Sequence, residues 1–255
     1  MFEAIQAFRA KLASGQVGLG CGITLTDPSV IEALGQRPDF YWIDLEHAPL
    51  DYQALLGHLV AVRTTVRPAL VRVRGSDVPS IKTVIDTGAD GIIVPQIGSA
   101  DEVRQVVEAT RYVPLGKRGM GPRRAAMYGN EDEIEYVRRA NQELFISVQI
   151  ENVDALEQVD EIVAVEGIDS VVIGPSDLAN SMGYLGQLDH ADVVAAIGTI
   201  IEKTKTAGKF IGMGLGADEE LVNRAVGWGV QWVQAGGDYS YMVQRYEQLV
   251  RAIET

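Results

Sequence analysis

The chain has 255 residues, of which 47% are hydrophobic and 22% charged, and its formal net charge is −13. A chain of this length can bury a large core, either as one α/β barrel or as two smaller domains. The negative charge argues against a nucleic-acid or anionic-membrane partner, because such binding depends on Lys and Arg side chains. Cys21 is the only cysteine, which excludes an intrachain disulfide and a zinc–thiolate site.

The first 15 residues predict an amphipathic helix rather than a signal sequence. Phe2, Ile5, Phe8 and Leu12 repeat at helical spacing, and Glu3 stands where a signal sequence would be basic. No apolar run approaches the length of a membrane span. We therefore expect a cytoplasmic protein.

Eight short apolar runs follow, and most are succeeded by a stretch with helical periodicity. The runs are nearly continuous rather than alternating, which is typical of parallel strands buried on both faces. Several helix-to-strand joints, such as TGADGIIV, VEGIDSVVIG and VGWGVQWVQ, place a Gly where a helix has to end. The predicted strands are VGLGCGI (from Val17), FYWID (Phe40), ALVRV (Ala69), GIIVP (Gly91), FISVQI (Phe145), SVVIG (Ser170), FIGMG (Phe210) and WVQAG (Trp232).

Eight βα units after an N-terminal helix predict a single (β/α)8 barrel domain over residues 1–255. The alternative, a doubly wound open sheet, is less favoured by eight units in one run. The segment RYVPLGKRGMGPRRAAMYGN, between the fourth and fifth strands, is too polar for the core and too long for a tight turn. We expect it to hang over the mouth of the barrel.

Polar residues gather after several of the predicted strands, where barrels of this type carry their chemistry. Acids collected in one mouth repel one another unless a cation lies between them. The residues are Asp44, Glu46 and His47 after the second strand, Arg72 on the third, Gln149 and Glu151 on the fifth, Gly174–Asp177 after the sixth, and Gly236–Asp238 after the eighth.

Glu151 and Asp177 lie one βα unit apart, hence on neighbouring strands separated by about 4.8 Å. Two carboxylates so placed suit Mg²⁺ or Mn²⁺ better than Zn²⁺, since no cysteine is near. The competing interpretation is that Ser176 or Asp177 only caps the following helix. For Glu151 that interpretation is weaker, because the neighbouring Asn152 is the better cap.

His47 and Arg72 would face the metal across the cavity, as an acid/base and as a cation suited to a developing oxyanion. The other histidines, His58 and His190, fall within a helix and at a helix start. No lysine is placed to form a Schiff base on an inward-facing strand position. Carbonyl chemistry would therefore rely on the metal as a Lewis acid.

Taken together, these residues resemble the HpcH/HpaI aldolases, the metal-dependent class II pyruvate aldolases. The resemblance runs from about residue 20 to residue 240 and is carried by WIDLEHAPLD, ALVRVRG, TGADGIIVPQI, KRGMGPRRA, SVQIEN and IGPSDLANSMG. It implies a (β/α)8 TIM barrel of the phosphoenolpyruvate/pyruvate superfamily type. It also implies a last helix exchanged with a neighbouring subunit, in a homohexamer built as a trimer of dimers.

The resemblance further implies a set of roles for site residues. Glu151 and Asp177 would hold Mg²⁺, Mn²⁺ or Co²⁺, His47 would be the acid/base, and Arg72 would stabilise the enolate. Asp86 would raise the basicity of the histidine, although its position near a helix end predicts a solvated side chain; Asp44 is a second possible orienter. Substrate contacts carry over to Gln149, Gly174, Pro175, Ser176 and Asp177, together with Arg72.

The expected reaction is reversible aldol cleavage of a 4-hydroxy-2-oxo acid to pyruvate (or hydroxypyruvate) and an aldehyde, through a metal-stabilised enolate. Aldolases for 2-keto-3-deoxy sugar acids and for 4-hydroxy-2-oxoheptanedioate share these motifs. The loop Lys117–Gly129, with Arg118, Arg123 and Arg124, is expected to line the acceptor end or to pack the oligomer. The alternatives are a citrate-lyase-β-like acyl-CoA lyase and a non-catalytic, metal-dependent binder of oxo acids.

Overall fold

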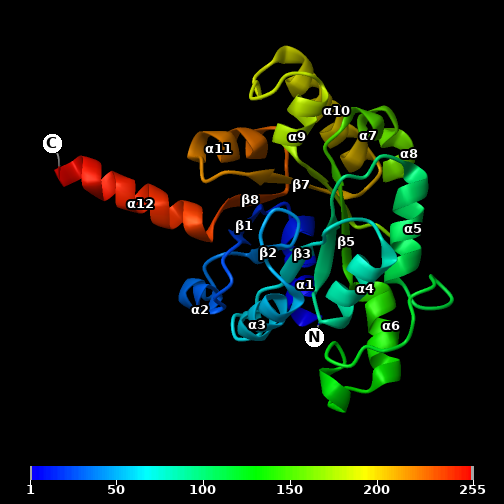
Figure 1. Ribbon diagram of the computed structural model, residues 1–255. Coiled ribbons are helices and arrows are strands. Elements are labelled where there is room, and N and C mark those ends of the chain that lie inside the picture. Colours follow the sequence, from blue (N-terminus) through cyan, green and yellow to red (C-terminus); the bar gives the residue numbers. More distant parts are fainter. Residues whose placement is uncertain (1, 254–255) are drawn as a thin grey trace.

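The computed structural model describes residues 2–253, and its centre is a closed parallel barrel (Figure 1). The eight strands follow one another in chain order around the barrel. The predicted (β/α)8 fold is therefore confirmed, and the alternative prediction of a doubly wound open sheet is wrong. The strands are β1 Gly18–Ile23, β2 Phe40–Asp44, β3 Ala69–Arg72, β4 Gly91–Val94, β5 Phe145–Ile150, β6 Ser170–Ile173, β7 Phe210–Leu215 and β8 Trp232–Gly237.

Most of the helices surround the barrel, and three helix-to-strand joints contain the glycine that the sequence predicted. Gly88, Gly167 and Gly229, in the three joints with a shared pattern, all have φ near +95°, the left-handed region in which a helix stops before a strand. Between residues 2 and 253, no helix combines the length and apolar character that a membrane span requires. The helices are α1 Glu3–Ala13, α2 Ser29–Leu34, α3 Tyr52–Val62, α4 Val78–Asp86, α5 Ala100–Thr110, η1 Met127–Gly129 (3₁₀), α6 Glu133–Glu143, α7 Val153–Glu157, α8 Val159–Val163, α9 Pro175–Ser181, α10 Ala191–Thr206, α11 Glu219–Gly227 and α12 Asp238–Ile253.

A contact repeated four times fixes the register of the strands at the amino end of the barrel. The residue before each even-numbered strand accepts a hydrogen bond, through its side chain, from a backbone N–H at the start of the preceding odd-numbered strand. The structural repeat is therefore a pair of βα units, longer than the single unit that the glycine pattern indicates. The pairs are Asp39 with Leu19 (2.9 Å), Asp90 with Ala69 (2.9 Å), Asp169 with Ile146 (2.8 Å) and Gln231 with Ile211 (3.1 Å).

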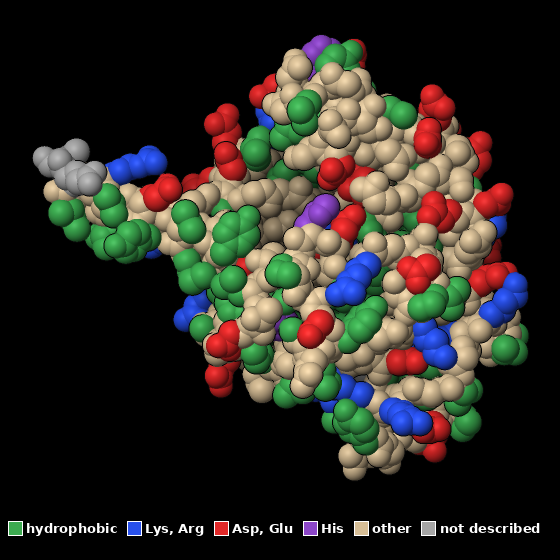
Figure 2. Space-filling model, in the orientation of Figure 1, with side chains coloured by type: hydrophobic (Ala, Val, Ile, Leu, Met, Phe, Trp, Pro, Cys, Tyr) green, Lys and Arg blue, Asp and Glu red, His purple; other side chains and the backbone are tan. Residues whose placement is uncertain are grey.

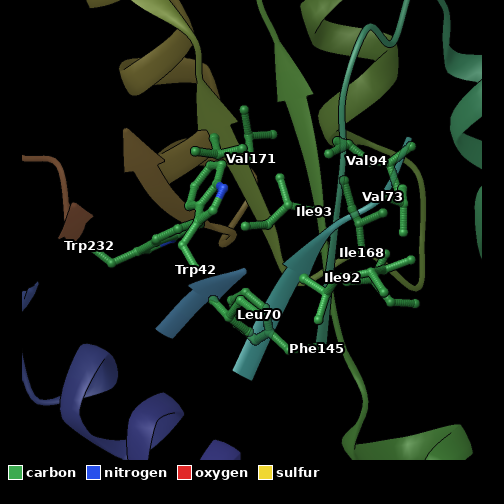
Figure 3. Packing of buried hydrophobic residues seen from close by; sticks show 14 of the residues in the cluster. Trp42, Leu70, Val73, Ile92, Ile93, Val94, Phe145, Ile168, Val171 and Trp232 are labelled. Carbon is green, nitrogen blue, oxygen red and sulfur yellow. The ribbon is translucent and has the colours of Figure 1, made fainter. Parts of the chain in front are cut away.

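The barrel interior changes from apolar to polar along the strands. Phe40 and Trp232 pack edge to face near the amino end, with ring centroids 5.4 Å apart. A Cβ at Gly212 would overlap the Trp232 ring, so this position has to be glycine. Trp42 lies above, next to Trp232 (Figure 3). Since alternate residues of a strand face the same side, Asp44 also faces the interior, at the carboxyl end of β2.

The long segment between α5 and α6 lies at the amino end of the barrel, so the prediction that it covers the mouth is wrong. Arg124 donates to the carbonyl oxygen of Thr87, at the end of α4. Met127 contacts Arg63, at the end of α3. The physical reason is chain direction: the segment follows α5 and leads through α6 to β5, and connections from a helix back to the next strand lie at the end where strands begin. Its arginines do not line the mouth of their own barrel.

Helix α12 does not pack along the barrel as the other helices do. It projects from the body, and hydrophobic side chains are visible along it (Figures 1 and 2). Tyr241, Met242, Tyr246 and Leu249 are all exposed. A helix with such an exposed apolar surface is typical of a protein–protein contact.

Candidate active site

One wall of the barrel mouth is an arginine held between two acids. Arg72, the last residue of β3, donates from Nε and Nη2 to the two oxygens of Asp44, at 2.9 and 2.6 Å. Its Nη1 lies 2.9 Å from Glu46 Oε2. All three side chains are largely buried. Such a bidentate pair fixes the orientation of the guanidinium plane.

The same guanidinium lies over an aromatic ring. The Arg72 Cζ is 5.4 Å from the centroid of Trp42, which comes two residues before Asp44 on the same face of β2. Trp42 in turn contacts Trp232, with ring centroids 6.0 Å apart. The position of the arginine is therefore set by the packed interior beneath it.

His47 stands at the rim of the same wall. Its side chain is 62% exposed, and its Nε2 lies 3.7 Å from Glu46 Oε2. Asp44 Oδ1 accepts from the backbone N–H of Glu46 (3.0 Å) and more weakly from that of His47 (3.3 Å). Asp44 thus orients the turn that carries His47, while Glu46 is the carboxylate nearest to the imidazole. Burial raises the pKa of Glu46 above its ordinary value, and Arg72 and His47 oppose that shift.

The opposite wall is built around Glu151, which follows β5 and is 2% exposed. Its Oε1 accepts from the backbone N–H of Gln96 at 2.8 Å, and its Oε2 accepts from Gln149 Nε2. Burial raises the pKa of Glu151 to about 7, and repulsion from Glu46 and Asp177 adds to the shift. A buried carboxylate that is hydrogen-bonded to amides rather than to a basic side chain is a position for a cation.

Residue 174 has to be a glycine because the side chains of Glu151 and Gln149 fill the space beside it. A Cβ at this position would lie 2.7 Å from Gln149 Nε2 and closer still to Glu151, so any side chain would displace the pair. Gly174 is also the N-cap of α9, where no side chain caps the helix. The interpretation of Ser176 or Asp177 as a helix cap is therefore wrong. Asn152 does cap α7, by accepting from the N–H of Ala155 at 2.8 Å, as predicted.

The residues present fit a divalent cation held by two protein oxygen ligands. Among residues 2–253, no group of three or more His, Cys, Asp or Glu side chains is arranged to hold a metal. Repulsion from the half-buried Asp177 contributes to the raised pKa of Glu151, and a cation bound between the two carboxylates would relieve this repulsion. Gln149 Oε1 is buried without a partner beside them. Two carboxylates leave coordination positions open for water and substrate, as Mg²⁺ sites commonly do.

Asp86 is not brought to the mouth. It ends α4 at the amino end of the barrel and accepts from Arg118 Nη2 at 2.6 Å. The Arg118 side chain is fully buried against Tyr112 and Tyr136. The expectation of a solvated Asp86 is wrong, and within one chain this residue does not reach His47.

Two residues of the site were not predicted from the sequence. Gln96 acts through its backbone N–H and has φ = +57°, an unusual value for a residue other than glycine, and residue type gives no sign of either property. Trp42 is an aromatic residue in an apolar strand, as many core residues are. Only its place two residues before Asp44 could have suggested a contact with Arg72. The other histidines lie as predicted, with His58 buried in α3 and His190 capping α10.

Comparisons with known proteins identify the family of the chain. A profile of the HpcH/HpaI aldolase/citrate lyase family matches residues 20–244. The chain is 37% identical over 247 residues to a hydroxypyruvate/pyruvate aldolase of Pseudomonas aeruginosa, covering 96% of this chain and 91% of that protein. It is 38% identical over 234 residues to the 2-keto-3-deoxy-L-rhamnonate aldolase of Escherichia coli O157:H7, covering 91% and 86%.

A solved structure extends the similarity to the fold. An HpcH/HpaI aldolase/citrate lyase family protein from Burkholderia cenocepacia J2315 superimposes with a TM-score of 0.91 at 28% identity, covering 98% of this chain and 99% of that one. The sequence match and the fold agree over nearly the whole chain. The chain therefore belongs to the HpcH/HpaI aldolase/citrate lyase family and is an enzyme of the lyase type.

Proposed function

We propose that this enzyme catalyses reversible, divalent-metal-dependent aldol cleavage of a 4-hydroxy-2-oxo acid, giving pyruvate or hydroxypyruvate and an aldehyde. The observation that carries the proposal is the pair of facing walls in one mouth: Glu151 with Asp177 on one side, and Arg72 with His47 on the other. The names of the two aldolases compared above support the same reaction class.

A Mg²⁺, Mn²⁺ or Co²⁺ ion held by Glu151 and Asp177 would supply a Lewis acid for the keto group of the 2-oxo acid. The turn at Gly174–Asp177, at the N-terminus of α9, together with Gln149, would bind the substrate carboxylate. The free backbone N–H groups of a helix N-terminus favour an anion there. The reacting carbons would then point towards the opposite wall.

Arg72 would stabilise the negative charge that develops on the keto oxygen. A guanidinium has five N–H groups, so contacts with Asp44 and Glu46 leave donors for a substrate oxygen. Because those contacts fix the guanidinium in advance, little reorganisation is needed as the charge forms.

His47 would move the proton. In cleavage it accepts the proton of the 4-hydroxyl while the C3–C4 bond breaks, the aldehyde carbonyl forms and the electron pair passes into the enolate. The same imidazolium then protonates C3 to give the 2-oxo acid. Its exposed place at the rim lets the aldehyde leave on that side.

The metal assignment is tested by retro-aldol cleavage of 2-keto-3-deoxy acids with and without EDTA. We expect activity to be lost on chelation and restored by Mg²⁺ or Mn²⁺. Glu151→Gln removes a charged ligand and should lower kcat/KM by roughly a hundredfold or more. Glu157→Gln, on the exposed surface of α7, is the matched control and should behave as the wild type. Full activity after complete removal of metal would refute the assignment.

The role of His47 is tested by exchange of the C3 protons of pyruvate in D₂O, followed by NMR. His47→Ala should keep pyruvate and metal binding but lose exchange by about 10² to 10⁴-fold, the usual contribution of a positioned acid/base. His190→Asn, which can still cap α10, should exchange normally. Exchange at the wild-type rate in His47→Ala would exclude this histidine as the acid/base, and loss of pyruvate binding would give it a different role.

We further propose that α12 packs on a neighbouring copy of the chain, in a homohexamer built as a trimer of dimers. Its support is the exposed apolar surface of the projecting helix. Replacing both Tyr246 and Leu249 with Glu should shift the particle mass, measured by light scattering, to smaller assemblies. Replacing both Val60 and Val66 with Glu is the control, because these two side chains are exposed away from α12, and it should leave the particle mass unchanged. A wild-type protein that is monomeric at micromolar concentration would contradict the proposal.

A further inference from the structure

A cavity of about 190 Å³ extends the mouth on the side across the barrel from Glu151. It is bounded by the ends of β1, β7 and β8 and reaches Arg72 and Trp42. Glycines at 22, 216, 236 and 237 line it, and their missing side chains leave the space open. The cavity is therefore continuous with the position proposed for the reacting carbons.

The cavity walls carry no free positive charge. Arg72 is the one basic residue among those that line it, and this side chain is already paired with Asp44 and Glu46. The arginines of the loop Lys117–Gly129 lie at the other end of the same barrel. A second carboxylate on the substrate would lose its hydration here without gaining an unpaired cation, which is unfavourable.

On its barrel side, the wall presents the side-chain amide of Gln234, whose oxygen accepts no hydrogen bond from the described residues. Gln234, on the inward face of β8, donates from Nε2 to the carbonyl oxygen of Gly236, which fixes the amide orientation. Among the described residues, no donor reaches its Oε1. Two of the hydroxyls in the lining already donate, that of Thr24 to Asp238 at 2.8 Å and that of Ser240 to the carbonyl oxygen of Gly237 at 2.8 Å. The third belongs to Tyr239, a side chain that is 54% exposed at the start of α12.

We propose that this cavity holds a neutral, hydroxylated tail of the substrate and that Gln234 Oε1 accepts a hydrogen bond from one of its hydroxyl groups. Gln234 is thus a specificity-determining residue. The inference rests on the proposed aldol function and narrows it: the preferred acceptor is a hydroxyaldehyde, rather than an aldehyde that carries a second carboxylate.

The test compares three acceptors with pyruvate as donor and saturating Mn²⁺: glyceraldehyde, propanal and succinic semialdehyde. For the wild type, we expect kcat/KM to be highest with glyceraldehyde, by about tenfold over each of the others, the effect of one good hydrogen bond. Gln234→Leu, which keeps the side-chain size, should lower kcat/KM for glyceraldehyde about tenfold and leave propanal unchanged. Gln105→Leu, on the exposed face of α5, is the matched control.

Exchange of the C3 protons of pyruvate, measured on every variant, separates the possible failures. Normal exchange in Gln234→Leu shows that the folded site is intact, so an unchanged preference for glyceraldehyde over propanal would overturn the inference alone. A wild-type preference for succinic semialdehyde would also overturn it. Absence of exchange in the wild type would overturn the proposed function, and this inference with it.

Discussion

The buried carboxylate of Glu151 is the constraint on which the rest of the site depends. A carboxylate that is 2% exposed and bonded only to amides is unstable in its charged form, and burial accordingly raises its pKa to about 7. The surrounding features keep it in place: glycine at 174 admits it, and the backbone of Gln96 holds its second oxygen. In the proposed function, a divalent cation bound there would offset the cost of burying this charge, and Arg72 on the facing wall would complete a chamber for an oxo acid.

The barrel supplies this chamber through a gradient in side-chain size and polarity along its strands. Aromatic rings fill the interior near the amino end, where Trp232 needs the space left by Gly212. Two residues further along each strand, the same inward face carries Trp42 and Gln234, and then Asp44. The apolar layer excludes water from below, so the ion pair of Arg72 with Asp44 is fixed on a rigid support. The side chains of the site are therefore positioned by the alternation of inward-facing and outward-facing residues along the strands, and not by the loops alone.

The sequence predicted the barrel and the mouth well, because both follow from local rules. Continuous apolar runs identify buried parallel strands, and the residue after such a run lies at the mouth wherever it is in the chain; Glu151 and Arg72 were found in this way. The features that the sequence did not predict depend on the end of the barrel at which a segment lies and on contacts between residues far apart in the chain. The loop Lys117–Gly129 was placed at the wrong end because its polarity says nothing about whether it follows a strand or a helix. Asp86 was expected to be solvated because its partner, Arg118, lies far along the chain.

The central claim is that Glu151 and Asp177 converge on one divalent cation that faces Arg72. Anomalous diffraction from crystals grown with Mn²⁺ and pyruvate tests it most directly, because the anomalous signal locates manganese without reference to any assumed ligand. If the claim holds, one strong peak per chain will lie between the two carboxylates, with pyruvate between that peak and Arg72. A peak bound elsewhere, or two carboxylates that point to different places with no peak between them, would contradict it.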